Sequence, residues 1–403
     1  MTDARTPSPA GARAATSRLG WLHFLNDFTL DFLTPLLPSS VPAAWVGLME
    51  GLADGLGQAL KLVTGRASDR SGRRASWVAG GYLVNAAARP LAAVGMLLSW
   101  PLWIVSCRIA DRIGKGLRGS ATDALISDWT KGEARTLAFA RMRTMDHLGA
   151  AAGGAAAAIA AWQLGADQIW IAVAGLVVIT AVVAWIAAGL RDAPQPTTKP
   201  GADGWWPSDP ALRRPLLATG LATAGVKLSP LLILIHVAGL PADASGGAGG
   251  AGGAGTWPLW AICLGWSALG LIQAGSAWIA GAIAARIGPG PMARWGWVAG
   301  AAAIASLAWA EGTWLIVAGL ATGVVLGASE GAEKAWLADI CPRHERARTF
   351  GALAIISAVA GLIANGLVGW LLVAWGPQIF LIAGGLGLLA VAVGGRTAPP
   401  AGA

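Results

Sequence analysis

The stretch Gly65-Arg-Ala-Ser-Asp-Arg-Ser-Gly-Arg-Arg74 decides the fold, because it is dense in charge and both of its flanks are apolar. The flanks, at about Trp45–Thr64 and Ala75–Leu98, each have the length of about 20 residues that a membrane-spanning helix requires. The stretch therefore predicts a short polar connection between two spans.

The composition of the whole chain agrees with a membrane protein. Hydrophobic residues make up 55% of the 403 residues and charged residues only 12%, whereas a soluble domain carries about 25% charged residues. The 57 glycines, many of them inside apolar runs, suit closely packed membrane helices. This composition excludes an ordinary soluble enzyme, a disordered chain and a coiled coil. The three cysteines show no metal-binding spacing, and we expect neither a structural zinc site nor a cofactor.

Twelve apolar runs are predicted to cross the membrane. They lie at about 21–38, 45–64, 75–98, 102–126, 137–161, 169–190, 215–240, 259–285, 293–310, 313–339, 350–374 and 379–393. A polar, proline-rich segment at 191–214 separates the sixth run from the seventh and has the composition of an exposed linker. The predicted domains are a six-helix bundle at 1–190, the linker, and a second six-helix bundle at 215–403.

Basic residues predict the orientation of these spans. The two termini and the even-numbered connections hold 19 of the 29 Lys and Arg residues, and the odd-numbered connections hold none. Basic connections stay on the cytoplasmic side, so both termini are expected there. The net charge of +8 then reflects topology, and no nucleic-acid partner is expected.

The two halves repeat each other at a constant offset of 211 residues. The repeated pairs are Gly116 and Gly327, Ala124 and Ala335, Asp128 and Asp339, Arg135 and Arg346, and Phe139 and Phe350. Chance matching in an Ala- and Gly-rich chain is the alternative, but the shared offset favours a true repeat. Six-plus-six parallel repeats are typical of transporters whose two halves rock around a central site.

The charged stretch at 65–74 resembles the signature loop of the major facilitator superfamily, G-x-x-x-D-R-x-G-R-R. The segment Arg112-Ile-Gly-Lys115-Gly116 is similar to the family's R-x-x-Q-G element, with Lys in place of Gln. The resemblance covers essentially the whole chain. It implies an all-α membrane protein with twelve transmembrane helices in two pseudo-symmetric bundles, working by alternating access. It also implies an intracellular gate built from Gly65, Asp69, Arg70, Gly72, Arg73, Arg74 and Arg112.

Ionisable residues inside the spans are the candidates for function, because they are costly to place in a membrane. The spacing of His23, Asp27 and Asp31 puts all three on one helical face. The candidates for contact with protons or substrate are His23, Asp27, Asp31, Glu50, Asp54, Lys61, Arg89 and Arg108. The four aspartates and glutamates are the expected proton carriers, and the two arginines could meet an anionic substrate. The alternatives are permanent salt bridges, such as Asp54 with Lys61, or a divalent-metal site formed by the acids and His23.

These observations predict a monomeric secondary transporter in the inner membrane of a bacterium, moving a small polar or charged solute and coupled to protons. The alternatives are an uncoupled facilitator, an exporter of divalent metals or drugs, and a membrane sensor or enzyme without transport activity. No set of catalytic residues supports an enzyme. The segment 327–331 matches the nucleophile motif G-x-S-x-G, but it lies in an apolar helix without the strand that this chemistry needs.

Overall fold

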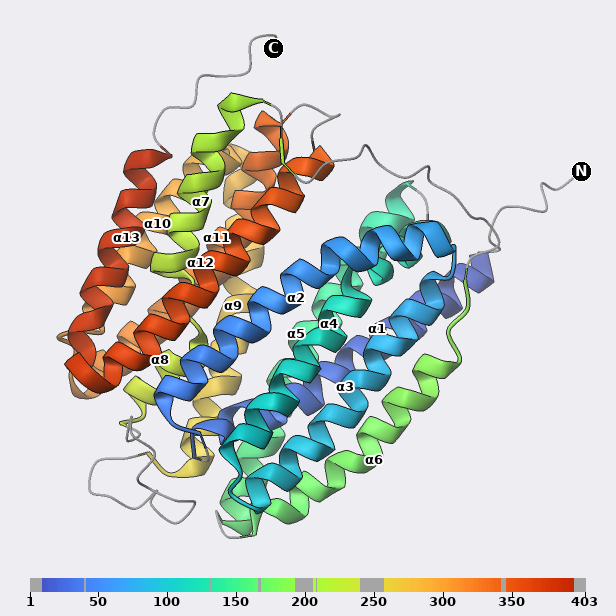
Figure 1. Cartoon of the computed structure of the whole chain (residues 1–403), viewed down its shortest axis with the longest axis horizontal. Helices are drawn as coiled ribbons and strands as arrows, with labels where there is room; N and C mark the ends of the chain where they lie inside the picture. Colours follow the sequence, from blue (N-terminus) through green and yellow to red (C-terminus); the bar gives the residue numbers. More distant parts are fainter. Residues whose placement is uncertain are drawn as a thin grey trace, which may run out of the picture.

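The computed structural model describes residues 9–39, 41–130, 132–165, 168–192, 206–207, 209–239, 257–341 and 346–394. Within these ranges the chain forms α-helices and short 3-10 helices, and no strand. The helices gather into two bundles that lie side by side (Figure 1). The predicted all-α fold with two six-helix bundles is therefore confirmed.

The first bundle contains the spans expected in the first half of the chain. Its elements are α1 (Pro9–Leu33), η1 (Thr34–Ser39), α2 (Ala43–Ser71), α3 (Arg74–Leu97), α4 (Pro101–Trp129), α5 (Gly132–Leu164) and α6 (Ile169–Ala188). The helix α2 is longer than predicted, because most of the charged stretch at 65–74 continues the helix. Only Gly72 and Arg73 form the turn, and Gly72 takes a left-handed conformation with φ of 64° that suits a residue without Cβ.

The second bundle contains the remaining six spans. Its elements are η2 (Pro210–Leu212), α7 (Arg213–Val226), α8 (Pro230–Val237), α9 (Leu259–Ile287), α10 (Pro289–Ser306), α11 (Gly312–Ile340), α12 (Arg346–Trp375), η4 (Gly376–Gln378) and α13 (Ile379–Val393). The last predicted span agrees with α13 at both ends. Part of the predicted linker, 193–205 with residue 208, lies outside the described residues.

The seventh span is broken in its middle, just before Pro230, whose ring cannot continue a helix from the preceding turn. The helix α7 ends at Val226, and α8 begins at Pro230. Ser229 caps the start of α8, because its hydroxyl accepts a hydrogen bond from the Leu231 amide at 3.3 Å. The Ser229 amide donates to Asn365 Oδ1 on α12 at 2.8 Å. The side chain of Asn365 thus gives the Ser229 amide the acceptor that the broken helix does not provide.

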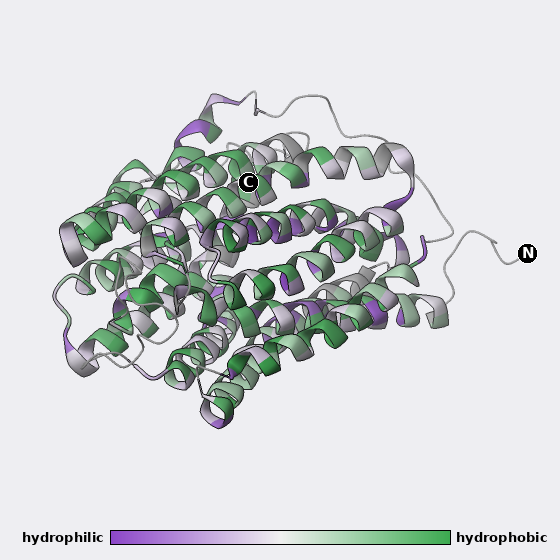
Figure 2. Cartoon of the chain, turned by 60° about the horizontal axis from the view of Figure 1, so that its bottom comes forward, coloured by the Kyte–Doolittle hydropathy of each residue, from purple (hydrophilic) through white to green (hydrophobic). Residues whose placement is uncertain are grey.

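The outer surface of the described helices is apolar. Hydrophobic residues predominate along the helices, and hydrophilic residues interrupt several of them between their ends (Figure 2). Trp185 and Trp278 are 77% and 80% exposed, as expected for side chains that face lipid rather than water. Five stretches are long and apolar enough to cross a membrane by length and composition alone, and α6 is the one that belongs to the first bundle.

The two bundles touch where α2 runs along α12. A Cβ atom on Gly47 would lie 2.3 Å from the Asn365 carbonyl oxygen, and one on Gly51 would lie 2.9 Å from Leu362. The two glycines are one helical turn apart, so they let the two backbones approach closely.

A second contact between the bundles joins α5 to α9. The Ser267 hydroxyl donates to the Ala151 carbonyl at 2.8 Å, and a Cβ atom on Gly154 would lie 3.0 Å from Ser267. Both contacts lie nearer to the ends of the helices at which α2 and α9 begin. We call this end, which includes η1 and α8, the closed end.

Candidate functional site

Two arginines on α4 hold Glu50 of α2. Arg108 donates from Nε to Glu50 Oε1 at 2.9 Å, and Arg112 Nη2 lies 3.5 Å from Glu50 Oε2. The side chains of all three residues are nearly buried. Arg108 and Arg112 are four residues apart, so a single face of α4 presents both guanidinium groups. Glu50, predicted as a proton carrier, is therefore part of a salt-bridge cluster in this conformation.

A second cluster joins α1, α3 and α4. Arg89 donates from Nε to Asp111 Oδ1 at 2.8 Å, and from Nη1 to the Asn26 carbonyl and the Thr29 hydroxyl. Asn85 also donates to Asp111 Oδ1, at 2.8 Å. Arg89 was expected to meet a substrate anion, but its guanidinium is occupied by protein groups in this conformation.

Further buried polar side chains connect the second cluster with α5. Arg118 donates to Asn85 Oδ1 at 3.2 Å and lies over the Tyr82 ring, with its guanidinium carbon 4.4 Å from the ring centroid. His23 Nδ1 is 2.5 Å from Asp146 Oδ1, and the His23 ring meets the Tyr82 ring edge to face. His23 is thus paired with an acid on α5 rather than with the other acids of α1.

Asp31 is the acid that links the two bundles. Its Oδ1 accepts a hydrogen bond from Trp266 Nε1 on α9 at 2.9 Å. Within the described part of the chain, Asp31 forms no ion pair. The neighbouring Asp27 accepts from Asn26 Nδ2 at 2.8 Å. The predicted acidic face of α1 therefore divides between two partners, and Asp31 is the member held across the bundle interface.

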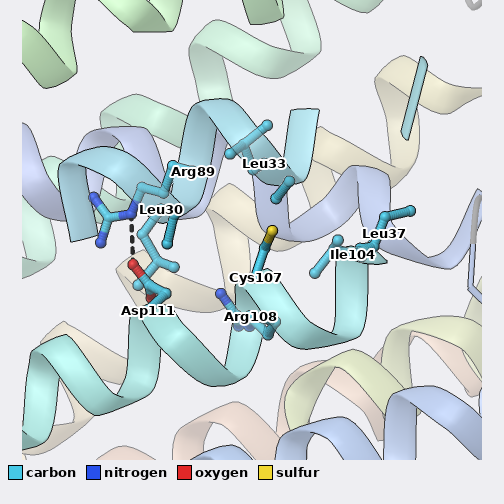
Figure 3. Close-up of a pocket in the computed structure, with 10 residues that line it drawn as sticks. Leu30, Leu33, Leu37, Arg89, Ile104, Cys107, Arg108 and Asp111 are labelled. Atoms are coloured by element: carbon cyan, nitrogen blue, oxygen red, sulfur yellow. Dashed lines mark hydrogen bonds and ion pairs between the residues drawn. The ribbon is translucent and has the colours of Figure 1, made fainter. Parts of the chain in front are cut away.

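A small cavity lies between α1, α3 and α4. Arg89, Arg108 and Asp111 provide its polar wall, while Leu30, Leu33, Leu37, Ala88, Ala92, Ile104 and Cys107 provide the rest. Figure 3 shows the Arg89–Asp111 ion pair at one side of this cavity, next to Leu30, and Leu37 with Ile104 at the other side.

The predicted gate residues of the charged stretch lie at the opposite end of α2 from the closed end, whereas the predicted gate residue Arg112 faces Glu50 instead. Arg74 forms an ion pair with Asp128 of α4, so it ties two helices of one bundle together. A Cβ atom on Gly65 would lie 3.3 Å from the Ser120 side chain on α4, and Arg73 is exposed. The side chains of Asp54, Asp69 and Arg70 lie outside the described residues. Lys61 donates to Gln58 Oε1 at 3.1 Å.

The described part of the second bundle contains a buried ion pair. Lys227, at the break between α7 and α8, pairs with Glu333 of α11, whose other oxygen accepts from Trp297 Nε1 at 2.7 Å. Glu333 is buried.

No group of three or more metal-binding side chains occurs among the described residues. The divalent-metal alternative does not fit the partners that the structure gives these side chains, because Glu50 faces two arginines and His23 faces a single acid.

Sequence reasoning selected some charged members of these clusters, among them His23, Glu50 and Arg89, but missed most of their uncharged partners. It did not select Thr29, Tyr82 and Asn85. Asn85 is an amide in the middle of an apolar run, which is the signal that could have identified it, because buried amides need partners. The contact between Trp266 and Asp31 had no such signal, since it joins residues 235 positions apart.

Comparison with known structures matches this arrangement to solute transporters. A peptide transporter aligns with a TM-score of 0.73 at 13% identity, covering 97% of this chain and 96% of that chain. A nucleoside transporter aligns with a TM-score of 0.71 at 13% identity, covering 94% and 98%. A bacterial homologue of the human lysosomal transporter Spinster, in an inward-facing and unoccupied conformation, aligns at 0.70 and 14% identity, covering 96% and 97%. These likenesses establish the fold alone.

Sequence comparison identifies the family. An uncharacterized MFS-type transporter of Methanocaldococcus jannaschii is 30% identical over 115 residues, which are 27% of this chain and 28% of that protein. An uncharacterized protein of Mycobacterium tuberculosis (strain ATCC 25618 / H37Rv) is 35% identical over 95 residues, 23% of this chain and 22% of that protein. The matches thus span about a quarter of the length of these curated relatives. The sequence model of the Major Facilitator Superfamily matches residues 19–268 and 264–402, and the chain therefore belongs to this superfamily of membrane transporters.

Proposed function

We propose that the chain is a proton-coupled secondary transporter that carries a small polar or charged solute across the inner membrane by alternating access. In this proposal both termini are cytoplasmic, so the closed end faces the periplasm. The chain acts as a monomer in the bilayer.

The observation that carries the proposal is the position of Asp31. A carboxylate inside a membrane bundle is costly, and it is retained where it serves a proton or ion pathway. Asp31 is the half-buried acid of α1 that accepts from the opposite bundle, while Glu50 and Asp111 are neutralised by arginines. An acid without a cationic partner takes up a proton more readily than one in a salt bridge. Asp31 is thus the proposed proton carrier.

The gate at the cytoplasmic end is proposed from the signature stretch. Asp69 and the adjacent arginines would lock this end when the closed end opens. Replacement of Asp69 by Asn should impair transport more than it impairs the amount of folded protein in the membrane. Near-normal transport by that variant would exclude this role for Asp69.

Proton flux into sealed proteoliposomes tests the function. A trapped pH-sensitive dye reports internal acidification while ions, sugars, organic acids and drugs are added in turn. We expect at least one solute to acidify the lumen in vesicles that contain the protein and not in empty vesicles. Solute entry without acidification would favour an uncoupled facilitator, and no flux of any solute would favour a sensor.

A further inference from the structure

We infer that Trp266 is a positioning residue for Asp31: with Ser267 it forms a latch that holds the closed end shut while Asp31 is ionised and loosens when Asp31 takes up a proton. This inference rests on the proposed function, because it describes how the proposed proton carrier acts on the closed end. Two hydrogen bonds between the bundles, the packing of α9 on the first bundle and the charges around Asp31 support it.

Two adjacent residues of α9 donate hydrogen bonds to different helices of the first bundle. Trp266 donates from Nε1 to Asp31 Oδ1 on α1 at 2.9 Å, and the Ser267 hydroxyl donates to the Ala151 carbonyl on α5 at 2.8 Å. Adjacent residues of a helix point in directions about 100° apart, so a single turn of α9 reaches both helices. We call Trp266 and Ser267 the latch.

The two helices that accept these hydrogen bonds are packed backbone against backbone. A Cβ atom on Gly149 of α5 would lie 2.3 Å from the Phe24 carbonyl oxygen of α1. One on Gly153 would lie 2.2 Å from the Phe28 carbonyl oxygen. Such close contact makes α1 and α5 one unit, and the latch therefore attaches α9 to this unit at two points.

Apolar packing surrounds the latch on the side of the closed end. Cys263 of α9 is fully buried and belongs to the same apolar cluster as Phe32 and Leu33 of α1, and Leu259 packs against this cluster. Because Leu259, Cys263 and Ser267 are four residues apart, they lie on one face of α9. Opening of the closed end must separate this face from the first bundle, and it must break both hydrogen bonds of the latch.

Of the two hydrogen bonds of the latch, the one to Asp31 depends on a proton. A hydrogen bond from the indole to an ionised carboxylate is charge-assisted and about twice as strong as one to a neutral oxygen. The Ala151 carbonyl does not titrate, so Ser267 donates to it at any pH. A proton on Asp31 therefore weakens one half of the latch and leaves the other half intact.

The same hydrogen bond determines where Asp31 gains and loses its proton. Two equilibria that share a contact affect each other reciprocally, so a closed end that the ionised acid stabilises also favours the ionised acid. Opening removes the Trp266 donor, and the acid then binds a proton more readily. In the proposed topology, Asp31 takes up its proton from the periplasm and releases it after the closed end has formed.

Charged groups of both signs face Asp31 from its own helix and from α4, and further acids act on the same arginines. The groups that interact with Asp31 are Asp27, Arg108 and Arg112, and the further acids are Glu50 and Asp111. The side chain of Asp54 on α2 lies outside the described residues. These groups set the pH at which Asp31 titrates, so the experiment compares the size of a pH response among variants rather than its midpoint.

The helices α5 and α9 place their own titratable groups further along. On α5, Asp146 is paired with His23, and His147 follows it, one helical turn before Ala151. The charged residue of α9 is Arg286 in its last turn, about five helical turns from the latch. The partner that α9 offers to Asp31 is thus an indole, which does not titrate.

Distance measurements on the purified full chain in lipid nanodiscs test the inference. After replacement of the three native cysteines, spin labels at the exposed positions Ile159 of α5 and Leu264 of α9 report the separation of these helices. We call the share of the distribution at long distances the open fraction. From mildly alkaline to mildly acidic pH it should rise about fivefold, because a hydrogen bond to a charged group exceeds a neutral one by about that factor.

Replacement of Trp266 by Phe removes the indole donor and keeps an aromatic ring. The open fraction of this variant should be larger at alkaline pH, and its response to pH should be lost. Trp103→Phe is the matched control, because Trp103 Nε1 donates to the Leu91 carbonyl within the first bundle at 2.9 Å, and it should respond to pH as the original chain does. An unchanged pH response in Trp266→Phe would overturn the inference, as would an original chain whose closed end ignores pH.

Two further variants separate the halves of the latch. Ser267→Ala should raise the open fraction at every pH and keep the pH response, because the hydrogen bond that it removes does not titrate. Asp31→Asn should show no pH response, because its amide still accepts from the indole but takes up no proton. If Trp266→Phe does not fold, Asp31→Asn decides, and a pH response that persists in this variant would contradict the latch.

The failure of this inference can be told apart from the failure of the proposed function. Proton-driven uptake of a solute by a protein whose closed end responds to pH equally with and without the Trp266 indole would refute the latch and leave proton coupling intact. A pH response that depends on Trp266, in a protein that moves no solute together with protons, would keep the latch and refute proton coupling.

Discussion

At the scale of single residues, the side chains of the two clusters differ in how they could change during a transport cycle. Arg89 and Asp111 are held by several partners from three helices, which makes them a structural joint of the first bundle. The hydrogen-bond partner that Asp31 has among the described residues belongs to the other bundle. A change at Asp31 therefore reaches the contact between bundles directly.

Replacement of Asp31 by Asn separates its proton-binding role from its structural role. The amide oxygen of Asn can still accept from Trp266 Nε1, but the side chain no longer takes up a proton. We expect loss of proton-driven accumulation, with exchange of labelled for unlabelled solute retained, both measured in proteoliposomes. The control Asp209→Asn, at the cap of η2, should transport normally. Normal accumulation by the Asp31 variant would remove Asp31 from the mechanism.

The ion pair of the second bundle predicts an effect on stability. Replacement of Lys227 by Met leaves the buried Glu333 carboxylate with the Trp297 donor alone among its described contacts. Removal of one partner from a buried pair costs about 3 kcal/mol or more. We expect a loss of this size in the free energy of unfolding, measured by reversible unfolding with SDS in mixed micelles. The double variant Lys227→Met, Glu333→Gln should recover much of it, and no recovery would argue against charge burial as the cause.

At the scale of helices, the contact between α2 and α12 depends on small residues. A Cβ on Gly47 would overlap the Asn365 carbonyl oxygen, whereas a Cβ on Gly366 of α12 would meet no atom within 4 Å. The two glycines look alike in the sequence, but only one of them sets the distance between the bundles.

This difference predicts opposite outcomes for two alanine substitutions. Spin labels at the exposed positions Leu48 and Leu367 report the distance between α2 and α12. Gly47→Ala should lengthen and broaden the distance distribution, because the helices must separate to admit the methyl group. Gly366→Ala should leave it unchanged. The same distribution in both variants would mean that this contact does not hold the closed end together.

The positions of the helices could be predicted from the sequence, but the residues that pair between helices could not. Apolar length alone located α13 at both of its ends. The end of α2 was placed too early because Arg, Ala and Ser are compatible with a helix even when charged, so polarity did not mark the turn. The pairing of Arg89 with Asp111 could not be predicted, since both lie on spans with several possible neighbours.

At the scale of the whole molecule, the positions of the two bundles relative to each other determine which end of the protein is closed. The contacts of α2 with α12 and of α5 with α9 keep one end closed, and the signature stretch lies at the other end. No local sequence pattern contains this information, because the contacts join residues that are more than one hundred positions apart.

The predicted orientation can be checked in intact cells. After replacement of the three native cysteines, a single cysteine at Ser99, between α3 and α4, should react with a membrane-impermeant maleimide. A cysteine at Ser71, at the end of α2, should react only after the inner membrane is permeabilised. Basic connections are retained in the cytoplasm, so the reverse pattern of labelling would invert the proposed topology.

The account is tested most directly by uptake into proteoliposomes, under an imposed pH gradient that is acidic outside, of the labelled solute that acidifies the lumen in the dye assay. It predicts accumulation above the external concentration for the original chain, abolished when the gradient is collapsed and absent in the Asp31→Asn variant. Accumulation in that variant equal to that of the original chain, or uptake that ignores the gradient, would contradict it.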